Sequence, residues 1–129
     1  MTLMKDAKSG KINEIIEEVA REENIEPRVL MQRIAEGKVA IPRNINRKEI
    51  KLAGVGKGLR TKVNVNIGTS TLYTDLEMEK RKARVAIKFG ADTIMDLSTG
   101  KELDKTRREL LKIAPIPFGT VPILSLIHI

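Results

Sequence analysis

The sequence has 129 residues, an apolar fraction of 41% and a net charge of +7, with no cysteine and no tryptophan. The lack of cysteine excludes disulfides, thiolate nucleophiles and sulfur ligands to a metal within these residues. No apolar run reaches the ~18 residues that span a bilayer, and the N-terminus lacks the pattern of a signal peptide. We therefore expect a cytoplasmic protein that does not contact membranes.

Residues 1–37 are predicted to form a helical hairpin. Over residues 10–23, apolar side chains recur at helical spacing between charged ones, namely Ile12, Ile15, Ile16 and Val19. Pro27 suits the first turn of a second helix, and Gly37 would end it. We interpret the hairpin as a packing or dimer element.

Residues 38–61 are predicted to be a basic, glycine-containing connector. Residues 38–62 hold eight Lys and Arg against one acidic residue, a net charge of +7 (8 − 1). The segment GVGKG (54–58) lacks the GK-then-Ser/Thr order of a phosphate-binding loop. The basic side chains could face a phosphate-bearing ligand, contact another part of the protein or a second subunit, or be solvated; those concerned are Lys51, Lys57, Arg60 and Lys62.

From residue 62 the pattern becomes that of an α/β protein. Alternating apolar residues predict a strand over 63–67, then a helix that Gly90 closes, a strand at 93–95, a second helix that ends before Pro115, and a strand at 118–124. This order favours a parallel sheet with right-handed crossovers. Capping boxes are predicted for the two helices, with Thr74 and Glu77 at the first and Thr99 and Glu102 at the second.

The carboxyl ends of the first two strands carry the candidate ligand-binding residues. Parallel α/β folds bind ligands at these ends. Asn66 could offer a donor and an acceptor to a ligand, or could bond only its own loop. Met95 reads as core filling from the sequence alone, and alternation places Asp96 on the opposite side. Asp96 could bond loop amides or contact the ligand, and Ser98 could supply a hydroxyl.

Several motifs together resemble one enzyme family. They are IPRNIN (41–46), GVGKGLRTK (54–62), NIGTS (66–70), MDLSTG (95–100) and PIPFGTVPI (115–123). In this order and spacing they are similar to the phosphomethylpyrimidine synthase family, from about Ile12 to Ile123. The resemblance covers only the amino-terminal part of the family's chain. It implies a truncated barrel, in which residues 62–123 are the first three units of a (β/α)8 fold.

The resemblance also implies a function for the full-length enzyme. Family members convert aminoimidazole ribotide to hydroxymethylpyrimidine phosphate in thiamine biosynthesis, as radical S-adenosylmethionine carbon–carbon lyases. They use a 4Fe-4S cluster held by a cysteine triplet and a divalent metal, zinc or iron, and a homodimer is expected. By resemblance, Asn66 and Met95 bind the substrate, and Met95 thus acquires a role that its residue type alone does not indicate. We identify no catalytic acid, base or nucleophile, so the chain alone is expected to be inactive.

The end of the chain departs from the family. Leu124 stands where the family has a substrate-contacting tyrosine, and residues 124–129 resemble nothing in it, so we interpret them as a non-native tail. His128 lies in that tail, and one imidazole does not make a metal site.

Two other functions remain open at the level of sequence. One is a non-enzymatic module whose basic connector binds RNA or an acidic partner, although the connector lacks the aromatic residues that RNA readers stack on bases. The other is a different phosphosugar-binding barrel that shares only the geometry of its rim.

Overall fold

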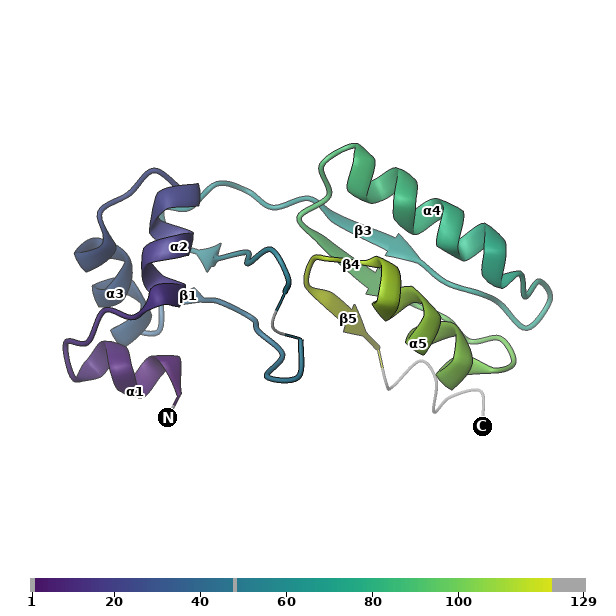
Figure 1. Cartoon of the computed structure of the whole chain (residues 1–129), viewed down its shortest axis with the longest axis horizontal. Helices are drawn as coiled ribbons and strands as arrows, with labels where there is room; N and C mark the ends of the chain where they lie inside the picture. Colours follow the sequence, from purple (N-terminus) through teal and green to yellow (C-terminus); the bar gives the residue numbers. More distant parts are fainter. Residues whose placement is uncertain (1, 48, 122–129) are drawn as a thin grey trace. The chain divides into compact units, whose positions relative to one another are not determined.

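The computed structural model describes residues 2–47 and 49–121 (Figure 1). The predictions for Leu124, His128 and the tail lie outside these residues. The chain is mixed α/β and forms two compact units; the described part of the first is 2–47 and 52–61, and that of the second is 49–51 and 62–121. None of the described helices is long and apolar enough to cross a membrane.

Three helices begin the first unit: α1 (Leu3–Lys8), α2 (Glu14–Glu22) and α3 (Pro27–Ala35). The predicted hairpin is α2 and α3, with Pro27 in the first turn of α3 and Gly37 just beyond its end at φ +72°. No apolar period in the sequence predicted α1, which has six residues and packs against α3. Its buried Asp6 accepts a hydrogen bond from Asn13, the residue that also caps α2.

Most of the basic segment folds with these helices. Strand β1 (Val39–Ala40) pairs antiparallel with β2 (Val55–Gly56), and Leu52 and Ala53 are buried in the same unit. The sequence did not predict β2, because its residues read as a flexible glycine run. Gly56 is required there, since a Cβ would lie 2.2 Å from the Lys38 carbonyl oxygen. Helix α3 ends at Ala35, and the second segment of the first unit ends at Thr61.

The second unit is a three-stranded parallel sheet with two helices. Its elements follow in the predicted order: β3 (Asn64–Ile67), α4 (Leu76–Lys88), β4 (Thr93–Asp96), α5 (Leu103–Ile113) and β5 (Phe118–Thr120). The strands lie in the order β3-β4-β5, and both pairs are parallel. Consecutive strands are therefore neighbours, as the alternation of strand and helix signals predicted.

One face of this sheet packs against α4 and α5 to form the core (Figure 1). Alternate strand residues contact small residues of the helices, and these small side chains allow the helices to pack close to the sheet. The buried residues are Ile67, Ala83, Ala86, Ala91, Ile94, Leu110, Ala114 and Ile116. The period-2 alternation consequently directs the intervening strand residues to the opposite face.

The starts of α4 and α5 differ from the predicted capping boxes. Asp75 caps α4 by accepting a hydrogen bond from the Met78 amide (3.0 Å), while the Thr74 hydroxyl donates to the Ser70 carbonyl. The residue before α5 is Glu102, in the left-handed region at φ +56° and without a side-chain cap. Thr99 does not cap α5, because the helix begins only at Leu103 and the cap position is Glu102; the Thr99 amide donates to the Thr69 carbonyl of the neighbouring loop.

The Asp75 cap predicts a specific acid sensitivity. The hydrogen bond from the Met78 amide lowers the pKa of Asp75 from its ordinary 3.8, so folding favours the ionised form. Its stabilisation is complete above pH 3.8 and is lost as the pH falls below that value. Asp75→Asn keeps an accepting oxygen but does not titrate. We would measure the free energy of unfolding of the wild type and of Asp75→Asn by urea titration at several pH values between 6 and about 3. The wild type should lose stability relative to Asp75→Asn at the lowest pH values. A difference that stays constant with pH would contradict this.

Candidate functional site

Asn66 and Met95 lie beside each other in the sheet. They are register partners on β3 and β4, and Met95 is in turn the partner of Gly119 on β5. A Cβ on Gly119 would lie 3.0 Å from Met95 Cε and 3.1 Å from its Sδ, so the thioether lies over the glycine. The row Asn66–Met95–Gly119 thus combines an amide, a flexible apolar side chain and a position without a side chain.

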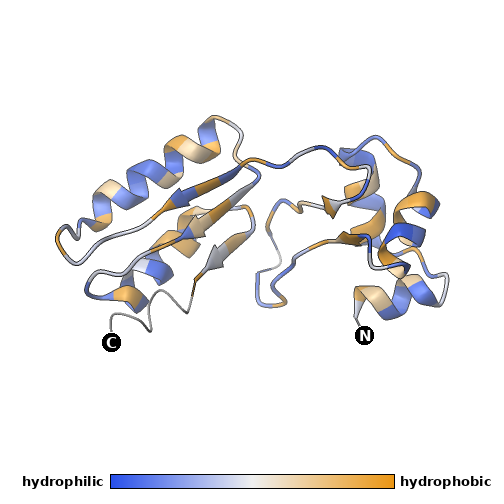
Figure 2. Cartoon of the chain, turned by 180° about the vertical axis from the view of Figure 1, so that it is seen from behind, coloured by the Kyte–Doolittle hydropathy of each residue, from blue (hydrophilic) through white to orange (hydrophobic). Residues whose placement is uncertain are grey.

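This row lies on the face of the sheet opposite α4 and α5, which we call the open face. Along β3, Asn64 and Asn66 are exposed whereas Ile67 is buried against the helices. The alternation is visible in the hydropathy colours of the strand in Figure 2. On β4, Thr93 and Met95 are half-buried on the open face. Both residues predicted to bind substrate are therefore on one surface, near the carboxyl ends of the strands.

Asp96 and Ser98 lie on the other side of the sheet. Asp96 is 0% exposed and Ser98 is 1% exposed. The Asp96 carboxylate accepts hydrogen bonds from the Ser98 amide and hydroxyl, and from Arg107 Nε of α5 at 3.1 Å. A buried carboxylate requires such partners. Of the two roles open to Asp96, the structure favours bonding the loop, and both residues stand away from the open face.

A buried polar network joins the loops that follow β3 and β4. The Thr69 amide donates to Ser98 Oγ (3.0 Å), and the Gly68 amide donates to Glu79 Oε2 (2.7 Å). Glu79, on α4, is 2% exposed and also accepts from Lys82 Nζ at 2.6 Å. These bonds satisfy buried carboxylates with loop amides, so they fix the backbone at the strand ends.

Gly68 is the tightest point of this arrangement, and its substitution should be costly. It has φ +151°, and a Cβ at this position would lie 2.6 Å from the Ser98 amide nitrogen. Both groups belong to the backbone, so a rotation of a side chain cannot relieve the clash. We expect Gly68→Ala to lower the free energy of unfolding by about 3 kcal/mol or more. Gly90→Ala is the matched control, because Gly90 has φ +85° with open space around it; it should cost only about 1–2 kcal/mol. If urea titrations show the same loss of unfolding free energy for both variants, the close contact at Gly68 does not contribute to stability.

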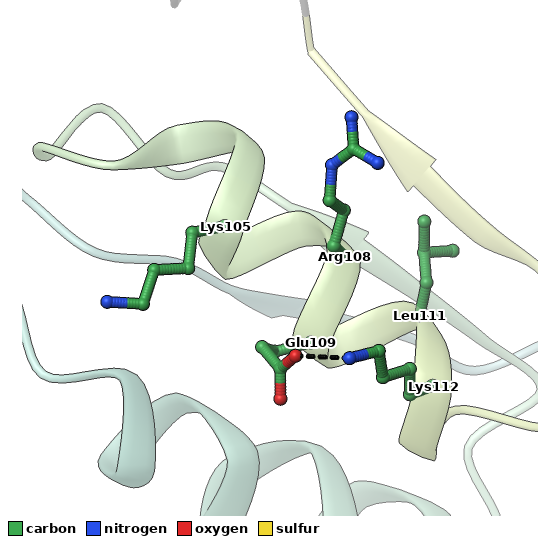
Figure 3. A pocket seen from close by; sticks show the side chains of 5 residues that line it. All are labelled: Lys105, Arg108, Glu109, Leu111 and Lys112. Atoms are coloured by element: carbon green, nitrogen blue, oxygen red, sulfur yellow. Dashed lines mark hydrogen bonds and ion pairs between the residues drawn. The ribbon is translucent and has the colours of Figure 1, made fainter.

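Two surface hollows are lined by residues other than those of the row. One of about 550 Å³ is lined entirely by α5 (Figure 3), with Lys105, Arg108, Glu109, Leu111 and Lys112. The other, of about 250 Å³, lies in the first unit and includes Lys57. Of the connector's basic residues, Lys57 and Arg60 belong to the first unit while Lys51 and Lys62 belong to the second. These four residues are therefore divided between the two units.

Sequence comparison decides the family. A profile of the Radical SAM ThiC family matches residues 2–129. The chain belongs to this family. The predicted resemblance to phosphomethylpyrimidine synthases is thereby confirmed.

Relatives in the ThiC family are about half identical to this chain. Phosphomethylpyrimidine synthase 1 of Methanothermobacter thermautotrophicus is 50% identical over 123 residues, which are 95% of this chain and 28% of the relative. The phosphomethylpyrimidine synthase of Thermodesulfovibrio yellowstonii is 53% identical over 123 residues, 95% of this chain and 29% of the relative. That of Desulforamulus reducens is 48% identical, with 95% and 28% covered. The chain thus spans somewhat more than a quarter of these relatives.

Sequence reasoning missed three residues of the open face in this ThiC-family chain. Asn64 and Thr93 are register partners that adjoin the predicted pair Asn66 and Met95, and Gly119 completes the row. The alternation NVNI does place Asn64 on the same side as Asn66, so that signal was present. The approach of Met95 to Gly119 depends on strand pairing, which the sequence does not state.

The chain offers no thiolate ligand to the iron–sulfur cluster of a radical SAM family. It contains no cysteine, the residue that holds iron–sulfur clusters through thiolates. Across residues 2–47 and 49–121, no group of three or more His, Cys, Asp or Glu side chains could hold a metal ion.

Proposed function

We propose that this chain is part of a phosphomethylpyrimidine synthase and forms one side of its substrate pocket. The observation that carries the proposal is the register of Asn66 with Met95 on the open face, near the carboxyl ends of parallel strands. The names of relatives that are about half identical to the chain support it. The substrate would be aminoimidazole ribotide, and the product hydroxymethylpyrimidine phosphate.

The parallel sheet would be the beginning of a (β/α)8 barrel. In that fold, strand residues alternate between a packed interior and an outer ring of helices, and the active site lies at the carboxyl ends of the strands. The sheet β3-β4-β5 has its helices on one face, which would be the outer face, and the open face would line the interior. Further strands would then have to pair with β3 and β5.

Asn66 and Met95 would bind different parts of the substrate. An amide side chain can hydrogen-bond the polar atoms of a nucleotide. The methionine thioether is flexible and polarizable, so it can pack on an unsaturated ring. Gly119 leaves the space in which the Met95 side chain lies, and so determines where that contact is made.

In the complete enzyme, S-adenosylmethionine and the cluster would supply the radical chemistry of a carbon–carbon lyase, together with a divalent metal. The ligands for these groups would come from residues outside this chain. The contribution of the present residues would be to hold the ribotide in one orientation and to exclude water from one side of the pocket.

Binding by Asn66 can be tested in a full-length chimera. In it, this chain replaces the matching segment of the Methanothermobacter synthase, so that the rest of the enzyme is present. Asn66→Ala should weaken ribotide binding by about 1–3 kcal/mol, or roughly 5- to 150-fold in Kd, because a polar contact in the pocket is lost. Asn46→Ala, at an exposed position of the first unit, serves as the control and should leave Kd unchanged. Calorimetry that found the same Kd for both variants would remove Asn66 from the pocket.

The isolated chain should show no turnover. Even with iron, sulfide, reductant and S-adenosylmethionine supplied, a chain without cysteine offers no thiolate ligands for the cluster. Chromatographic assay for hydroxymethylpyrimidine phosphate should therefore give none above background, while the parent chimera forms it. Product from the purified 129-residue chain would refute this expectation.

A further inference from the structure

We propose that Asn64 and Thr93 are positioning residues that fix the orientation of the Asn66 amide, so that Asn66 Nδ2 donates to an acceptor atom of the ligand. This inference rests on the proposed function, because it assigns a direction to a hydrogen bond of the same pocket. It predicts that the substrate atom opposite Asn66 is a ring nitrogen or an oxygen with a free lone pair. An N–H group of the substrate would not fit there.

The geometry is a chain of two hydrogen bonds along the open face. The Thr93 hydroxyl donates to Asn64 Oδ1 at 2.7 Å. Asn64 Nδ2 then donates to Asn66 Oδ1 at 3.1 Å. Asn64 and Thr93 are register partners, and Asn66 is two residues further along β3 on the same face. The three polar side chains therefore form one row that runs toward the carboxyl end of the strand.

The direction of these bonds determines what Asn66 can offer. A side-chain amide has one accepting oxygen and one donating nitrogen, which diverge from the same trigonal carbon. Because Asn66 Oδ1 faces Asn64, its Nδ2 points away from Asn64. Within residues 2–47 and 49–121, the structure records no hydrogen bond from Asn66 Nδ2. This donor is consequently the part of Asn66 that can meet a ligand.

Thr93 is suited to begin the row. Its β-branched side chain has few rotamers, and its amide donates to the Val63 carbonyl at 3.2 Å, so the hydroxyl has a defined position. The hydroxyl can donate to Asn64 Oδ1 only if that oxygen faces β4, and this leaves Asn64 Nδ2 for Asn66. An acceptor-only group at position 64 would reverse the row, because it would draw Asn66 Nδ2 toward itself and turn Oδ1 to the ligand.

Two variants at position 64 separate the two orientations in the full-length chimera. Asn64→Ala frees the Asn66 amide to rotate, so ribotide Kd should rise about 2- to 5-fold. Asn64→Asp holds the amide in the wrong orientation, so Kd should rise at least about tenfold, more than for alanine. Thr93→Val should resemble Asn64→Ala, whereas Thr93→Ser keeps the hydroxyl and should restore the parent Kd. Urea titrations on each variant monitor folding.

A double-mutant cycle distinguishes positioning from charge repulsion or a general structural effect. If Asn64 acts through Asn66, then Asn64→Asp should have no further effect on Kd when Asn66 is already alanine. Repulsion between the introduced carboxylate and the substrate phosphate would persist in that background. Equal Kd values for Asn64→Asp and Asn64→Ala, or an undiminished effect of Asn64→Asp beside Asn66→Ala, would overturn the proposal.

A spectroscopic measurement tests the row even if the parent chimera does not bind the ribotide, an outcome that would refute the proposed function by itself. With selective nitrogen-15 labelling of asparagine, Thr93→Val should shift the side-chain amide resonances of both Asn64 and Asn66, and Thr93→Ser should not. If the Asn66 amide resonances are unchanged by Thr93→Val and by Asn64→Ala, the row does not exist and the proposal is wrong.

Discussion

The parallel register of β3, β4 and β5 is the constraint on which the site depends. It sets Asn66 beside Met95 and Met95 beside Gly119, although these residues come from segments far apart in the chain. Side chains in a strand alternate between faces, so the same register that buries Ile67 and Ile94 under the helices presents Asn66 and Met95 on the open face. A slip of one residue would bury the amide and expose the core. Core packing and the geometry of the site are thus two consequences of one arrangement.

Buried polar groups hold that register at the strand ends. Asp96 and Glu79 are buried carboxylates on the helix side of the sheet. Each accepts hydrogen bonds from the backbone of a loop that follows β3 or β4, and from a basic side chain. An unpartnered carboxylate there would cost several kcal/mol, so the loops are confined to conformations that present their amides. Gly68 allows the β3 loop to come close enough for this contact. The hydrogen bonds of Ser98 and the close approach at Gly68 thus fix the loops that adjoin the row on the open face.

The chain divides its polar residues between two roles by their position in the alternation. On the helix side, Asp96, Ser98 and Glu79 make buried hydrogen bonds, whereas Asn64, Asn66 and Thr93 on the open face bond one another along a surface. The family's cluster chemistry needs thiolates that this sequence does not contain. The open face instead carries amide and hydroxyl groups, to which the proposed function assigns the orientation of a substrate. This agrees with a chain that spans 28–29% of the relatives described above.

The sequence alone determined the alternation of strands and helices from residue 62 onward, the α2–α3 hairpin, and the family, because these depend on local periodicity and on short motifs. It also predicted Asn66 and Met95 as substrate-binding residues, and the prediction for Met95 came from resemblance, since its residue type fits a core equally well. Only the tertiary structure showed the hydrogen bonds of Asp96 and Ser98, the cap at Asp75 and strand β2. It also placed Asn64, Thr93 and Gly119 on the open face. Each of these depends on which atoms from distant segments are brought within hydrogen-bond or van der Waals distance, and a local pattern does not contain that information.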